Sequence, residues 1–205
     1  MQRSIRDFPF VTVVIAVINV VVFLIMEYFG STLDTGYMLK CGALSYAEAV
    51  TQGEYYRFIT SMFLHFGFEH LLNNMFLFIV VGYHLESIIG KLRYLFIYIS
   101  AGVIAGIVSL GYHYFYMREL TVSAGASGAI FGVMGALLIT FVFGIGRERV
   151  SPSRIVIFLL LTLYSGSKDV EVDAVAHVVG FVVGVVVLFF IMVLPTIIKN
   201  KTALR

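Results

Sequence analysis

The stretch SAGASGAIFGVMGALLITFVF, residues 123–143, decides the fold class of this chain. Residues 126–143 carry no charge and approach the ~20 apolar residues that an α-helix needs to cross a lipid bilayer. Glycine recurs along the stretch at Gly128, Gly132 and Gly135, and small residues allow neighbouring membrane helices to approach closely. The stretch therefore predicts a membrane-spanning helix that packs tightly against a second helix.

The composition of the whole chain agrees with a membrane protein. Hydrophobic residues make up 60% of the 205 residues and charged residues 13%, against about 45–50% and about 25% in ordinary globular proteins. A water-soluble domain, a disordered chain and a nucleic-acid-binding protein are all excluded, the last because the net charge is only +2. Cys41 is the only cysteine, which excludes an internal disulfide and a cofactor held by cysteine clusters.

Five segments have the length and composition of membrane spans, and a sixth is shorter but bounded on both sides by charged or polar residues. We therefore predict an all-α, polytopic bundle of six transmembrane helices, forming one domain over residues 1–205, with a long outer loop over residues 30–64. The predicted spans are Phe10–Phe29, His65–His84, Tyr94–Tyr112, Ala126–Phe143, Ile155–Ser165 (the short one) and Ala174–Leu194.

The distribution of basic residues predicts the orientation in the membrane. Ten of the 14 Lys and Arg residues lie before the first span, after the last, or in the loops that follow spans two and four. Cytoplasmic loops carry such a positive excess, so both termini are predicted to be cytoplasmic in a multi-pass protein of the cell (plasma) membrane. The long first loop then lies on the outer side, as short amphipathic pieces along the interface.

Four polar side chains are predicted to lie at one depth, in the outer halves of three spans: His70, Asn74, Ser127 and His177. Such groups cost free energy in lipid and persist where they face the interior of a bundle. A serine and a histidine at one depth are the components of nucleophilic acyl transfer, so Ser127 is the candidate nucleophile and His177 the candidate base. The His70 and Asn74 side chains are candidates for stabilising an oxyanion, together with the backbone N–H of Ser127.

Glycines flank both candidate catalytic residues. Gly125 and Gly128 leave backbone room for a substrate beside Ser127, and Gly180 gives the sixth span a smooth face three residues after His177. The glycine spacing differs from the nucleophile elbow of soluble hydrolases, because Ala129 stands where that motif has glycine. The smooth faces predict that spans four and six touch, which would bring Ser127 and His177 together.

Three motifs together resemble those of the rhomboid intramembrane serine proteases: HFGFEHLLNN at residues 65–74, GASG at 125–128, and AHVVG at 176–180. The resemblance implies a Ser127–His177 dyad without an acidic third member, with His70 and Asn74 lining the oxyanion site. It implies transmembrane segments of other membrane proteins as substrates, and neither a cofactor nor a metal. Two positions depart from the family: Tyr56 replaces a frequent tryptophan, and Phe131 replaces the tyrosine that stacks on the catalytic histidine in some members. Three residues resemble structural positions of the family: Arg57, Glu86 and Gly90.

The sequence leaves two other classes of function open. A rhomboid-like protein without protease activity would bind or escort transmembrane segments, although it would need neither Ser127 nor His177. A transporter or channel is disfavoured because the chain shows no inverted repeat and no paired charges at mid-depth. The oligomeric state is not predicted.

The other polar residues are interpreted as structural, interfacial or solvated rather than catalytic. His65 is interpreted as interfacial or structural, and His84 and His113 as residues that wet helix ends. Asp173 is predicted to lie in a solvated outer loop. It lies four residues before His177, close enough to orient it, but the sequence disfavours a role as a third triad member. Span five and the polar loop after it are predicted to form a lateral gate for substrate, because Ile155–Ser165 is short and lacks glycine.

Overall fold

The computed structural model describes residues 8–117, 121–146 and 173–195. Within these ranges the regular structure is helical, apart from one isolated antiparallel bridge between Leu44 and Ser123. Four helices are long and apolar enough to cross a membrane, and a fifth, α6, is apolar but shorter. The four are α1 (Phe10–Phe29), α4 (Gly67–Ile89), α5 (Lys91–Tyr112, extended by the π-helical turn His113–Met117) and α8 (Ala174–Leu188, extended by the π-helical turn Phe189–Val193); α6 is Ser127–Val142.

These helices confirm the all-α membrane class and correct the predicted bounds of the second and third spans. The span predicted over His65–His84 is helical from Gly67 to Ile89, and the next helix begins at Lys91 rather than at Tyr94. The later end of α4 and the earlier start of α5 arise because helical backbone extends past the apolar residues until a turn stops it. Here the stop is Gly90, whose φ of +83° separates α4 from α5. The predicted span Ile155–Ser165 and its proposed gating role lie outside the described residues.

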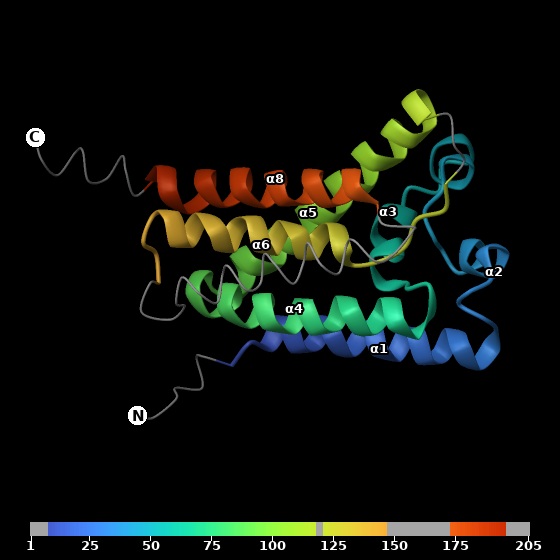
Figure 1. Ribbon diagram of the computed structural model, residues 1–205, viewed down its shortest axis with the longest axis horizontal. Helices are drawn as coiled ribbons and strands as arrows, with labels where there is room; N and C mark the ends of the chain where they lie inside the picture. The colour runs from blue at the N-terminus through green and yellow to red at the C-terminus, as the bar shows by residue number, and fades with distance from the viewer. Residues whose placement is uncertain (1–7, 118–120, 147–172, 196–205) are drawn as a thin grey trace, which may run out of the picture.

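Helices α6 and α8 lie side by side, and both begin toward the end of the bundle that carries the short helices of the first loop (Figure 1). At their glycines the two backbones approach each other directly. A Cβ atom at Gly180 would lie against the carbonyl oxygen of Gly128, and one at Gly184 against that of Gly132. The predicted contact between the fourth and sixth spans is therefore confirmed, and glycines of the two helices form it.

This close packing gives the first testable prediction. Gly184→Ala should lower the melting temperature of the detergent-solubilised protein, because the new methyl group would force α8 away from the Gly132 carbonyl. Overpacking of this kind typically costs about 1–3 kcal/mol. Gly111→Ala in α5 is the matched control, since a Cβ there meets no atom within 4 Å. Equal melting temperatures for the two variants would contradict the backbone contact.

The first loop folds into short helical pieces, as the sequence predicted. They are α2 (Thr35–Lys40), the π-helical turn Ala47–Thr51, α3 (Arg57–Thr60) and the 3₁₀ turn Ser61–Phe63. Arg57 holds them together: its side chain is 6% exposed and donates hydrogen bonds to the Leu39 and Ala43 carbonyl oxygens at 2.7 and 2.8 Å. The structural position that the resemblance implied for Arg57 is therefore an anchor of loop backbone.

Arg57 also pairs with Glu54 at 2.5 Å. Hydrogen bonds from Arg57 and then from Tyr56 lower the pKa of the Glu54 carboxyl below its ordinary value. A lowered pKa in the folded state means that this pair contributes stability above the ordinary carboxyl pKa and loses it as the pH falls through the folded-state pKa. The Glu54–Arg57 pair therefore contributes to holding the loop above the ordinary carboxyl pKa and contributes less in acid.

The loop is joined to the segment that precedes Ser127. Leu44 and Ser123 exchange both backbone hydrogen bonds, at 2.9 and 2.8 Å, and the N–H of Gly125 donates to the Ser61 carbonyl oxygen at 2.9 Å. These three backbone bonds fix residues 123–125 to the first loop. The loop therefore positions the start of α6 as well as covering the bundle.

At the other end of the bundle, Glu86 caps the start of α1. Its carboxylate accepts hydrogen bonds from the N–H of Val11 at 2.9 Å, and from the N–H and hydroxyl of Thr12, each at 2.8 Å. The first N–H groups of a helix have no partner inside the helix, so a buried carboxylate satisfies them. Glu86 is 3% exposed, which agrees with the structural position that the resemblance implied.

Candidate active site

Ser127 is the first residue of α6 and is half-buried. The chain reaches it through Gly125, whose φ of +136° belongs to a region that favours glycine. A Cβ at Gly125 would lie 3.0 Å from two atoms of the His70 ring, Cε1 and Nε2. Gly125 therefore has two roles: it turns the chain into α6, and it lets the His70 imidazole approach the backbone two residues before Ser127.

His177 lies in the first turn of α8 and stacks on Phe131, with the ring centroids 4.0 Å apart and the planes 11° apart. Phe131 is one helical turn after Ser127, so it places the imidazole beside the first turn of α6. The expectation that a phenyl ring can pack on this histidine in place of tyrosine is confirmed. The neighbouring residues also meet, because a Cβ at Gly128 would lie 3.7 Å from the Ala176 carbonyl oxygen.

His70 and Asn74 lie one turn apart on α4. The Asn74 side chain is buried, and its Nδ2 donates a hydrogen bond to the His70 carbonyl oxygen at 2.9 Å. The imidazole of His70 is close enough to that of His177 for the two to interact electrostatically. His70 therefore connects α4 to the start of α6 and to His177, while Asn74 lies one turn further along α4.

His65 is a residue of this site that the sequence analysis did not assign to it. It is 1% exposed, so the interfacial interpretation is wrong and the structural one is kept. Its Nε2 lies 3.5 Å from the Ala126 backbone nitrogen, as the acceptor, and its ring packs edge-to-face on His70 at 5.2 Å. The signal available in the sequence was the glycine two residues after His65. In the structure Gly67 has a φ of +75° and turns the chain between His65 and α4.

The structure brings together Ser127, His177, Phe131, His70 and Gly125 at one end of the bundle, and places Gly128 and Gly180 in the backbone contact beneath them. Within the described ranges, no group of three or more His, Cys, Asp or Glu side chains is arranged to hold a metal ion. A hydroxyl, an imidazole, an amide and a helix N-terminus are groups that can attack a carbonyl, move a proton and stabilise an oxyanion.

Asp173 corrects a second interpretation. Its carboxylate accepts a hydrogen bond from the N–H of Ala176 at 2.9 Å, and its side chain is 19% exposed. It is therefore the N-cap of α8 and not part of a solvated loop. His113, assigned to a wetted helix end, lies with its Nε2 3.8 Å from the Asp173 carboxylate.

The family model described as "Rhomboid domain" matches residues 52–193, which include every candidate site residue. This chain belongs to the rhomboid family.

Two named proteins of Bacillus subtilis (strain 168) are similar to it. "Putative rhomboid protease YdcA" is 31% identical over 193 residues, covering 92% of this chain and 91% of that protein. "Rhomboid protease GluP" is 31% identical over 179 residues, covering 86% of this chain and 34% of that protein. "Rhomboid protease AarA" of Providencia stuartii is 27% identical over 207 residues, covering 90% of this chain and 73% of that protein. The chain thus spans about a third of GluP and most of the other two.

Proposed function

We propose that this protein is an intramembrane serine endopeptidase that cleaves transmembrane segments of other membrane proteins near the outer face of the membrane. The observation that carries the proposal is the stack of His177 on Phe131, one turn after Ser127. It supports His177 as the base, because the imidazole lies beside the first turn of the helix that Ser127 begins. Membership of the rhomboid family, with relatives named as proteases, supports the same activity.

In the proposed reaction Ser127 Oγ attacks the scissile carbonyl carbon while His177 accepts the hydroxyl proton. His177 then gives this proton to the leaving amine, and the acyl group stays on Ser127 until water, deprotonated by His177, releases it. The oxyanion would be stabilised by the backbone N–H of Ser127 and by the His70 and Asn74 side chains. Ser127 begins α6, and the first N–H groups of a helix lack partners within it and carry partial positive charge.

The proposed architecture is the six-span form of the family, with both termini cytoplasmic in the plasma membrane. Figure 1 supports an arrangement in which α1 begins and α8 ends at the same end of the bundle. The candidate site lies at the opposite end, beside the first loop, which agrees with the orientation predicted from the basic residues. The substrates and the lipid are the partners that this proposal requires.

Two measurements on the purified protein test the activity. A serine-directed phosphonate should label wild type at Ser127, and a single-span test protein in the same vesicles should be cut near its outer end. An escort protein or a transporter has no activated hydroxyl, so it would bind the span or move a solute without either result. Absence of both labelling and cleavage in a protein that melts cooperatively would overturn the proposal.

The proposed base also predicts the pH dependence of cleavage. His177 must be neutral to accept a proton, so activity should rise as the pH increases through its titration and level off above it. Asp173 and His70 are the charged or titratable groups that interact with His177 electrostatically. The measurement is the rate of cleavage between pH 5 and 9, with folding checked at each pH. A flat profile would point to a different base.

A further inference from the structure

Asp173 holds the first turn of the helix that carries His177. Its Oδ1 accepts the hydrogen bond from the Ala176 N–H, and its backbone carbonyl oxygen accepts one from the His177 N–H at 3.1 Å. Both bonds act on the backbone next to the imidazole. The position and direction of the His177 side chain therefore depend on where Asp173 is fixed.

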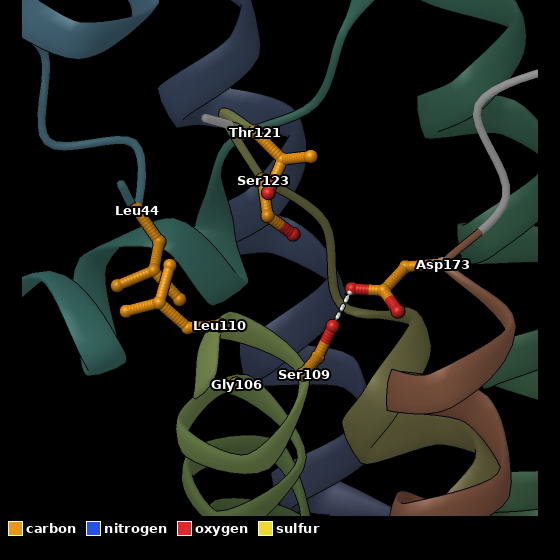
Figure 2. A pocket seen from close by; sticks show the side chains of 7 residues that line it. All are labelled: Leu44, Gly106, Ser109, Leu110, Thr121, Ser123 and Asp173. Carbon is orange, nitrogen blue, oxygen red and sulfur yellow. Dashed lines mark hydrogen bonds between the residues drawn. The ribbon is translucent and has the colours of Figure 1, made fainter. Parts of the chain in front are cut away.

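A side chain of α5 fixes Asp173. Figure 2 shows the hydroxyl of Ser109 pointing at the Asp173 carboxylate, and it donates a hydrogen bond to Oδ2. Ser109 is 3% exposed, so its hydroxyl is largely shielded from bulk solvent. His113, one turn further along α5, lies 3.8 Å from Oδ1. The carboxylate thus bridges the start of α8 to two consecutive turns of α5.

A small cavity adjoins this bridge. Ser109 and Asp173 line it together with Leu44 of the first loop and Ser123 of the segment before Ser127. Because the cavity leaves this side of the bridge incompletely packed, the hydrogen bond from Ser109 contributes to holding the start of α8 in place. Loss of the Ser109 bond would let the first turn of α8 shift toward the cavity, and His177 would shift with it.

We propose that Asp173 and Ser109 are positioning residues for His177. Among the described residues, the Ala176 N–H and the Ser109 hydroxyl donate hydrogen bonds to the carboxylate, and His113 Nε2 lies 3.8 Å from it, so Asp173 acts through the backbone of α8 and not as an acceptor for the His177 imidazole. A displaced base slows proton transfer without changing how the substrate span binds, because small misplacements of a reacting group cost rate. This inference rests on the proposed function, since it assumes that His177 is the base.

The test compares Ser109→Ala with Ser100→Ala. Ser100 is the matched control, because it lies on the same helix and its hydroxyl bonds the Ile97 carbonyl oxygen of α5 itself. We expect Ser109→Ala to lower kcat about tenfold, the scale of one charge-assisted hydrogen bond, with KM unchanged and Ser100→Ala equal to wild type. The rate of phosphonate labelling at Ser127 should fall in parallel, because it also requires the base.

Two substitutions of Asp173 extend the test. Asp173→Asn keeps an oxygen that accepts from the Ala176 N–H and places an amide NH2 group toward Ser109, whose hydroxyl can accept from it, so it should retain more activity than Asp173→Ala. Adding Ser109→Ala to Asp173→Ala should cause no further loss, because both changes remove the same bond.

Three results would overturn the inference: equal kcat in the Ser109→Ala and Ser100→Ala variants, a loss that appears in KM alone, or additive effects in the double variant. Each of these results compares a variant with a wild-type protein that is active, so none of them contradicts the proposed function. An inactive, unlabelled wild type would instead refute the proposed function itself, and with it this inference. The melting temperature of each variant distinguishes a displaced base from a general loss of folding. A general loss of folding would also count against a positioning role.

Discussion

Replacing Ser127 or His177 with alanine should reduce cleavage of a single-span substrate to background, a loss of about 10⁴-fold or more. In the proposed reaction Ser127 would supply the atom that forms the new bond, and His177 would supply the acceptor for its proton, so each change would remove a required step. The two changes should not add: the double variant should be no slower than either single variant. Cleavage rates in vesicles and phosphonate labelling measure this directly.

The controls use the same residue types at other places in the fold. Ser100→Ala in α5 and His84→Ala in α4 should both keep near wild-type rates, since neither residue lies at the end of the bundle where α6 and α8 begin. Ser127→Ala should also melt at the wild-type temperature, because Ser127 is half-buried and alanine suits a helix. Proteolysis retained by purified Ser127→Ala protein would contradict the dyad.

The helical fold was predictable because lipid imposes it. A run such as Phe10–Phe29 has one stable conformation in a bilayer, so its bounds in the structure equal the predicted ones. The contact of Gly180 with Gly128 was predictable for the same kind of reason, since small residues on a membrane helix mark close approach. Helix ends were less predictable, because Gly90 and not the last apolar residue separates α4 from α5.

The polar contacts around the site could not be read from the sequence. Arg57 donates to carbonyl oxygens 14 and 18 residues earlier, and Ser109 donates to a carboxylate 64 residues later. Neither partner follows from a local pattern, since both depend on how the helices and the loop pack. The position of His65 at the end of an apolar segment suggested an interface, but the residue is buried, and its ring contacts the Ala126 N–H and the His70 ring.

Asn74→Ala should lower kcat by about 10²-fold while leaving KM for a transmembrane substrate nearly unchanged, the usual result of removing one oxyanion donor. The structure shows how this amide is held: Nδ2 already donates one hydrogen bond to the His70 carbonyl oxygen, and Asn74 is 8% exposed. An amide nitrogen carries two N–H groups, so one can orient the side chain while the other donates to an oxyanion.

Asn73→Ala is the matched control, because Asn73 is the same residue type on the same helix and is exposed. It should leave kcat, KM and the melting temperature at wild-type values. A purely structural role for Asn74 predicts a different pattern, in which the melting temperature falls and Asn74→Ala loses activity only in proportion to unfolding. An unchanged turnover rate at saturating substrate would remove Asn74 from the oxyanion site and leave His70 and the Ser127 N–H as its donors.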